Sequence, residues 1–412
     1  MDLISTSSFV ESPFVIATFG DYTFGSYTGK STPTLSGRLM NVNFPNMMKS
    51  IEVEKINGQV NTYTVHMTYP ITENDDPNML EKVFSSIKNN REMTLTYGDW
   101  NNPTSIYRKE SALITGIQSN LSISSSKIDY TITGVSNSLT LNSVKCDFPA
   151  RRAKPSNVIR ELLYNPSYGL LDIFKGMTNR SLVNQKNLIP SDDKEVEIQA
   201  QSMSTLDYIR FLVENMTSVS ESNDAQIKQS IYQMCTVDDS SNEMGGPYFL
   251  IRKIDSRYNI RSYEGSWEVD VGYPGKNFVT GFDIENDESW SILYDYQDKI
   301  NQPQYIYRID NDGNITSEQS PSLMRSTKKM RVTQSTKHWW AQMTQFPITA
   351  TLTIKGLIRP TILMDYLKLN VLFYGNKHIS SGVYVITKQV DSVSSSGYRT
   401  TLSLLRIGGD EL

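Results

Sequence analysis

Two segments of the chain alternate strictly between apolar and polar residues. In 62–69 every odd position is apolar or aromatic and every even position is Thr or His, whereas in 348–355 the even positions are apolar and the odd ones are Thr or Lys. A period of two is typical of an antiparallel strand with one buried face, and threonine, a short β-branched residue, suits the other face. The pattern therefore predicts two half-buried strands, one toward each end of the chain.

Helical spacing of apolar residues occurs in only three segments. The first has Asp76 as its N-cap and Pro77 as its first helical residue, and the second begins at Ser156. The third is capped by Ser204, with Asp207 three residues later in the manner of a capping box. We therefore predict a mainly β protein with a few helices (α+β).

An internal repeat gives the domain organisation. Segments 112–136 and 384–408 both consist of a strand, a hairpin containing Ser-Ser-Ser and a second strand, with Ile-Thr at corresponding positions 114–115 and 386–387. A strand ending in Tyr-Gly precedes each copy, at 93–98 and 370–375, and an alternating strand comes earlier still. Recurrence of the same features in the same order predicts two β-domains related by duplication.

We therefore predict two related antiparallel β-domains and a middle segment between them. The expected boundaries are 1–145 for the first β-domain, 146–275 for a mixed linker and helical segment, and 276–412 for the second β-domain, with an insertion near 310–335. A polar stretch at 217–246 reads as a loop.

Composition excludes several classes of protein. The chain of 412 residues has 40 Lys and Arg against 44 Asp and Glu, a formal net charge of −4, which disfavours a dedicated nucleic-acid binder. No run of about 18 apolar residues is present, so we expect no membrane insertion. The start of the sequence lacks the pattern of an export signal, and Cys146 and Cys235 are too few for a disulfide framework. We expect buried, reduced thiols and assembly in a reducing cytoplasm.

The motifs that resemble functional sites each fail on spacing. Segment 25–31 has three residues, rather than four, before Gly-Lys-Ser, so it does not match a phosphate-binding loop. Segment 310–314 resembles a calcium loop, but its glycine is at the fourth position and its flanks read as strands, so a hairpin turn is favoured. The three histidines have no zinc-ligand spacing, and the carboxylates around 283–288 suit a solvated strand end. We predict no catalytic, cofactor-binding or metal-binding residue, and no enzyme.

With two related polar β-domains and no catalytic constellation, the chain resembles the baseplate central hub protein of contractile-tailed bacteriophages. The resemblance is in the order of features along most of the chain and is best at the C-terminus. The segments that resemble the hub's closing strands are 356–360, 369–373, 382–391 and 397–405, while 146–163 and 204–216 fall where that family has its linker and helices.

The resemblance implies a homotrimer in the baseplate of the virion tail. The resemblance also implies that the two β-domains are tail-tube-like antiparallel β-barrels. Two such barrels in each of three subunits would make a pseudo-sixfold ring, which would join the tail tube to the central spike. DNA, as cargo, and tape-measure protein would pass through its lumen. The resemblance supplies no catalytic residue, cofactor or metal.

Subunit contacts are expected from the strands themselves. Thr and Tyr on outward strand faces with little charge suit flat contacts, and ring closure would pair strand edges that a monomer leaves open. The expected interface residues are Thr64, His66, Thr131, Thr349, Thr351, Tyr384 and Thr401.

Two alternative functions stay open. One is a carbohydrate- or receptor-binding β-protein of a phage tail, suggested by 23 Tyr, 5 Trp and the pair Trp339-Trp340, and the other is a glycan-degrading enzyme with a carboxylate pair.

Overall fold

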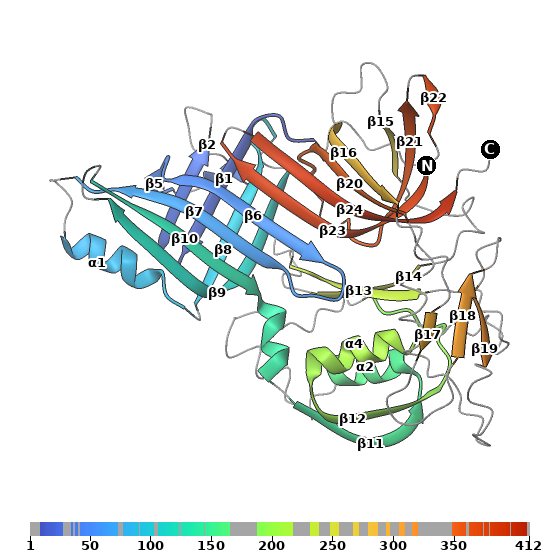
Figure 1. Cartoon of the computed structure of the whole chain (residues 1–412). Helices are drawn as coiled ribbons and strands as arrows, with labels where there is room; N and C mark the ends of the chain where they lie inside the picture. Colours follow the sequence, from blue (N-terminus) through green and yellow to red (C-terminus); the bar gives the residue numbers. More distant parts are fainter. Residues whose placement is uncertain are drawn as a thin grey trace.

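A computed structural model of the chain shows a long curled β-sheet with a smaller helical part beside it (Figure 1). The structure describes residues 9–27, 34–35, 38–39, 42–72, 77–89, 91–102, 106–122, 124, 126–143, 145–164, 188–216, 231–238, 248–254, 267–271, 279–286, 294–296, 305–309, 315–319, 348–359, 362–373, 375–378, 380–395 and 397–409. The prediction of a mainly β fold with few helices is confirmed.

The N-terminal third of the chain supplies strands to one half of the sheet. Its elements are β1 (Pro13–Phe19), β2 (Tyr22–Tyr27), β3 (Thr34–Leu35), β4 (Arg38–Leu39), β5 (Phe44–Pro45), β6 (Met48–Ile56), β7 (Thr62–Pro70), α1 (Pro77–Ser86), β8 (Glu92–Asp99), β9 (Tyr107–Ser122) and β10 (Lys127–Ser136). The predicted alternation in 62–69 is confirmed, since the apolar positions of β7 are buried and the Thr and His positions are half-buried. The predicted first helix is confirmed as α1, although its expected N-cap Asp76 lies outside the described residues.

The middle of the chain forms the helical part. Its elements are η2 (Asn137–Ser143), β11 (Lys145–Ala153), α2 (Pro155–Tyr164), β12 (Val196–Ser204), α4 (Thr205–Glu214), β13 (Ile231–Val237) and β14 (Tyr248–Ile254). The α4 cap is confirmed, because the Ser204 hydroxyl accepts a hydrogen bond from the Asp207 backbone N–H at 3.1 Å. Both helices pack their apolar faces into one core with β13 and β14.

The last part of the chain returns to the large sheet. Its strands are β15 (Trp267–Val271), β16 (Val279–Asn286), β20 (Ile348–Lys355), β21 (Tyr366–Phe373), β22 (Asn376–Lys377), β23 (Gly382–Ser394) and β24 (Gly397–Gly409). A separate three-stranded sheet is made by β17 (Tyr294–Tyr296), β18 (Tyr305–Ile309) and β19 (Ile315–Gln319). The antiparallel pairing of β18 with β19 agrees with the predicted hairpin, whose turn at 310–314 lies outside the described residues. The domain boundaries stay a prediction.

The same arrangement of five strands occurs twice in the large sheet. We call β6-β7-β10-β9-β8 the N-terminal unit and β16-β20-β24-β23-β21 the C-terminal unit, since neighbours in each series are hydrogen-bonded antiparallel strands. Each strand of one unit thus has a counterpart in the other, and the five counterparts follow one another in the same order along the chain.

Two β-bulges occur at corresponding places in the two units. Thr115 of β9 is skipped in the pairing with β10, and Thr387 of β23 is skipped in the pairing with β24. Likewise Lys49 of β6 is skipped against β7, and Thr280 of β16 against β20. A bulge inserts one residue at a specific point of a ladder, so two coincident bulges fix the correspondence of the units residue by residue.

This register corrects one of the correspondences predicted from the sequence repeat, that between the two Tyr-Gly dipeptides. The β8–β9 pairs Glu92–Leu113 and Met93–Ala112 match the β21–β23 pairs Tyr366–Val385 and Leu367–Tyr384. Position 97 therefore corresponds to position 371, and the predicted equivalence of the two Tyr-Gly dipeptides is wrong. Gly98 lies inside β8, whereas Gly375 follows β21 with a positive φ of 80°.

Candidate functional site: the junction between the two units

The two units are joined edge to edge by the C-terminal half of β23. Residues 382–385 of this strand pair with β21 of their own unit, while residues 388–394 pair with β6 of the other unit, from Lys388 opposite Ile56 to Ser394 opposite Ser50. The tip of the β23–β24 hairpin thereby enters the N-terminal core, where Val393 is 1% exposed. The junction is thus a shared sheet with a shared core, a much more rigid link than a flexible linker (Figure 1).

Three ionisable side chains are buried together beneath this junction. Glu110 of β9 accepts hydrogen bonds from Lys55 Nζ at 2.7 Å and from Arg108 Nη2 at 2.6 Å, both at Oε1, and none of the three residues is more than 3% exposed. Burial alone would raise the pKa of Glu110, but the charges of Lys55 and Arg108 hold the pKa below its ordinary value. The carboxylate is therefore ionised, and its Oε1 accepts from both cations.

A second carboxyl group, that of Asp391, comes from the opposite side of the junction. It accepts hydrogen bonds from Gln389 Nε2 and Thr400 Oγ1, each at 2.6 Å. Burial raises the pKa of Asp391 to about 6, against the opposing effects of Lys55 and Thr400. Because Gln389 lies directly opposite Lys55 in the β23–β6 ladder, these polar groups mark one register of the two units.

A third buried carboxyl group ties the middle segment to the N-terminal unit. Asp238, which directly follows β13, accepts hydrogen bonds from Ser136 Oγ at 2.7 Å, Asn61 Nδ2 at 2.7 Å and Tyr63 OH at 3.0 Å. Burial raises the pKa of Asp238 to about 6, and these hydrogen bonds oppose that rise. The group fastens β13 onto the ends of β7 and β10.

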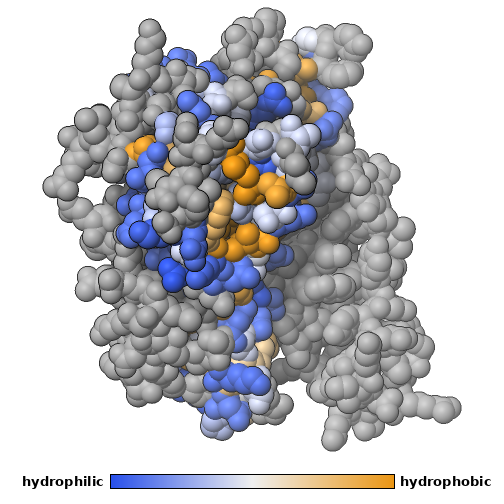
Figure 2. Space-filling model, turned by 90° about the vertical axis from the view of Figure 1, so that its left-hand side faces the viewer, coloured by the Kyte–Doolittle hydropathy of each residue, from blue (hydrophilic) through white to orange (hydrophobic). Residues whose placement is uncertain are grey.

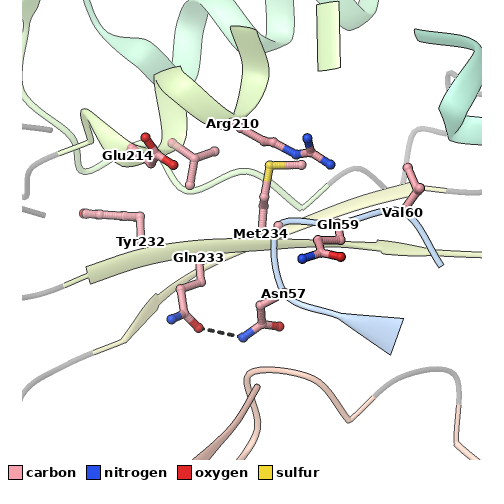
Figure 3. A pocket seen from close by; sticks show the side chains of 10 residues that line it. Asn57, Gln59, Val60, Arg210, Glu214, Tyr232, Gln233 and Met234 are labelled. Carbon is pink, nitrogen blue, oxygen red and sulfur yellow. Dashed lines mark hydrogen bonds between the residues drawn. The ribbon is translucent and has the colours of Figure 1, made fainter. Parts of the chain in front are cut away.

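The β6–β7 turn docks on the same strand beside a cleft of about 530 Å³ (Figure 3). The turn, predicted from Asn57-Gly58, is confirmed: Gly58 has a φ of 71° and donates its N–H to the Met234 carbonyl at 2.7 Å. Asn57 Nδ2 donates to Gln233 Oε1 at 2.8 Å. The charged groups of the cleft wall come from α4, where Arg210 Nη1 is paired with Asp207 at 2.9 Å. The cleft marks where the helical part meets the N-terminal unit.

The described residues contain no cluster of metal ligands. No group of three or more His, Cys, Asp or Glu residues there could hold a metal ion. The carboxyl groups of Glu110, Asp238 and Asp391 do not line the cleft. The two cysteines are buried, as predicted, and are not joined to each other in a disulfide. Among the helices described, none has the length and apolar character needed to cross a membrane.

Four of the interface residues expected from the sequence occupy corresponding positions in the two units, as two pairs. Position 64 corresponds to 351 and position 131 to 401 in the register of the two units. His66 Nδ1 lies 3.1 Å from Thr131 Oγ1 in the N-terminal unit, and at the corresponding place of the C-terminal unit Thr353 Oγ1 lies 3.3 Å from Thr401 Oγ1.

Within each unit these residues lie together on the polar face, away from the core. Thr64, His66 and Thr131 are half-buried, as are Thr349 and Thr401, and Thr351 is exposed. Tyr384 differs: it is fully buried and its hydroxyl donates to the Ser380 carbonyl at 2.6 Å. Trp339 and Trp340, on which the glycan-binding alternative depends, lie outside the described residues.

The junction and its buried charges were not predicted from the sequence, although one signal was present. Lys55 is in phase with the buried residues Ile51 and Val53, and Glu110 is in phase with Ala112 and Ile114. A charge on the apolar side of an alternating strand indicates a buried partner.

Known structures share this fold. The chain is similar to the 43 kDa tail protein of prophage MuSo2 from Shewanella oneidensis, with a TM-score of 0.50 and 10% identity over 96% of this chain and 98% of that one. A tail protein from Neisseria meningitidis has a TM-score of 0.49 and 9% identity, covering 96% and 97% of the two chains. No protein-family model matches the sequence, and no curated protein matches it significantly. Both of these structures are of tail proteins, and at these identities the likeness shows the fold alone.

Proposed function

We propose that this protein is a structural hub and adaptor of a bacteriophage tail baseplate, a homotrimeric, pseudo-sixfold ring that joins the tail tube to the central spike. The observation that carries the proposal is the five-stranded unit that occurs twice, with both bulges in corresponding places, in one continuous sheet. Two such units in each of three copies make six, so the ring presents six similar edges to a sixfold tube and three identical chains to a threefold spike.

The polar faces of the units support a passage through the ring. Equivalent positions of the two units carry threonine, as at Thr64 and Thr351 and at Thr131 and Thr401. Glu52 lies opposite Thr64 and Asp283 opposite Thr351 on these faces. A face of threonines and carboxylates, in a chain whose net charge is −4, attracts DNA weakly, because affinity for DNA comes mainly from Lys and Arg at the phosphates. We propose that DNA and tape-measure protein pass along these faces without being held.

The remaining parts of the proposal follow from this role. The protein is assembled in the host cytoplasm and resides in the baseplate of the virion tail. Its partners are copies of itself, the tail tube protein, the central spike protein and the tape-measure protein, and its function requires no cofactor or metal. The fold shared with tail proteins supports this location.

Oligomeric state tests the proposal directly. Light scattering on the purified protein is expected to give three times the chain mass of 46.8 kDa, and negative-stain images are expected to show rings with a central hole. Adding tube or spike protein should shift any monomer toward the ring. A protein that stays monomeric alone and in both mixtures would overturn the proposal.

A further inference from the structure

The strand that forms the junction inside the chain, β23, has a counterpart in the N-terminal unit whose junction-forming half has no partner strand on that side among the described strands. β9 corresponds to β23, and its N-terminal half pairs with β8 as that of β23 pairs with β21. The C-terminal half of β23 then pairs with β6, but residues 116–122 of β9 have a strand partner only on the β10 side in the part of the chain that the structure describes.

The missing partner strand is present elsewhere in the same molecule. β6 corresponds to β16, which pairs with β20 on one side and ends the sheet on the other, as far as the described strands show. The β9–β10 hairpin and β16 lie toward opposite ends of the curled sheet (Figure 1), so one chain does not bring them together. Among the described strands, each chain thus has one edge of each kind that lacks a neighbouring strand on one side.

We propose that residues 117–122 of β9 pair antiparallel with residues 281–286 of β16 in a second copy of the chain. The register follows from the junction inside the chain: position 388 opposite 56 becomes position 116 opposite 287, so Leu121 lies opposite Phe282 and Asn120 opposite Asp283. This interface rests on the proposed ring and specifies how its subunits join. Adding a strand to an open edge supplies backbone hydrogen bonds along the whole contact.

Exposure of apolar side chains supports a second copy as the occupant. Ile117 is 36% exposed and Leu121 is 57% exposed, although both lie opposite apolar residues of β10 on the face that carries the core. The counterpart of Leu121 is Val393, which is 1% exposed because it lies opposite Ile51 of the other unit. Figure 2 faces this end of the molecule and shows apolar side chains uncovered among hydrophilic ones. Phe282, which packs at the edge of the C-terminal core, completes the pair in the second copy.

The chemistry of the two junctions differs in one informative way. The counterparts of Lys55, Gln389 and Asp391 at the proposed interface are Asn286, Ile117 and Ser119. No charge therefore falls on the core-facing side of the paired segments. Such an edge associates with a second copy without burying an unpaired charge.

Paired cysteines test the contact and its register together. Asn120 and Asp283 are both exposed on the outer side, so N120C with D283C is expected to give a covalent trimer under mild oxidation, visible on a non-reducing gel. The matched control is S392C with E52C, the corresponding exposed pair inside the chain, which should close within one chain. S122C with E285C lies four residues out of register, about 13 Å, and is expected to give no bond.

A single substitution tests the apolar contact. L121D is expected to weaken ring association about tenfold or more, because the leucine loses its cover and a charge is buried. L188D, at another leucine that is 56% exposed, is expected to leave association unchanged.

The outcomes separate this inference from the proposed function. Rings that form while N120C/D283C stays uncrosslinked and S392C/E52C closes would overturn the interface and leave the hub function standing. Crosslinking of S122C/E285C instead would overturn the register. Loss of tube binding by L121D with intact rings would assign this edge to the tube protein, against our proposal. The absence of rings in every form of the protein, wild type included, would remove the proposed function itself.

Discussion

Replacing Lys55 by Met should destabilise the protein strongly, because the substitution leaves buried negative charge without its partner. Lys55 is 1% exposed and donates to Glu110, which is fully buried, while the neighbouring Asp391 also lies within the interior. After K55M, Arg108 alone must compensate the carboxyl groups of Glu110 and Asp391. Breaking a buried pair by removing one partner costs about 3–5 kcal/mol. We therefore expect the ratio of folded to unfolded protein to fall roughly a hundredfold to a few thousandfold.

The control for K55M lies on the same strand. Lys49 of β6 pairs with Asp129 at 2.8 Å, but its side chain is 53% exposed. K49M therefore removes an ammonium group from an ion pair that water can reach. Exposed pairs contribute little, and we expect K49M to resemble the wild type. Urea denaturation followed by tryptophan fluorescence compares the two midpoints, and hydrogen exchange in 50–56 and 388–394 reports opening of the junction itself.

Two results would refute the reasoning. One is a urea midpoint for K55M equal to that of K49M, which would mean that water reaches the three charges. The other concerns the double variant K55M/E110M, which removes a cation and an anion together. It should lose less stability than the sum of the two single variants, because each single change leaves the other group unpaired. Strict additivity would show that Lys55 and Glu110 do not interact in solution.

Three further predictions concern stability. The pKa of Asp238 is raised by burial to about 6 from 3.8, so the folded state holds its proton more tightly; this group costs stability above pH 6, and the cost is relieved as pH falls toward 4. D238N should therefore reduce the dependence of the melting temperature on pH between 5 and 7.5, leaving the part that comes from Asp391, and an unchanged slope would contradict this. G356A should lower stability by about 1–3 kcal/mol, since its new methyl would lie 2.1 Å from the Tyr398 ring, whereas G397A meets nothing within 4 Å and should unfold like the wild type in urea. S204A should cost about 1 kcal/mol by removing the α4 cap, measured as a shift in thermal unfolding, and no shift would show the cap to be dispensable.

Local sequence patterns predicted the helices and strands of this fold, but they did not predict which strands pair when the strands are far apart in the sequence. The alternation of 62–69 gives the buried face of β7 because side-chain direction in a strand depends only on neighbouring residues. The pairing of β6 with β23 joins residues more than 330 positions apart, and any exposed edge strand in the sequence would serve equally well by pattern alone. Lys55 shows the same limit: its phase marks it as buried, but the identity of its partner Glu110 depends on how β9 and β6 meet in space.

The internal junction and the subunit contact that we propose use corresponding strands. Inside the chain the tip of the β23–β24 hairpin of the C-terminal unit pairs with β6 of the N-terminal unit. The N-terminal unit has a corresponding hairpin, β9–β10, and the C-terminal unit has a strand that corresponds to β6, namely β16. A contact between unlike surfaces either closes into a ring or runs on as a filament. If the rotation across the proposed contact equals that across the internal one, closure depends on that single angle, and three chains close when it is a sixth of a turn. The buried charges under the internal junction then have a clear physical role, because they stabilise a single register of a contact that is permanent. The edge that we propose as the subunit contact has no such charges, in keeping with a contact that forms between separate copies.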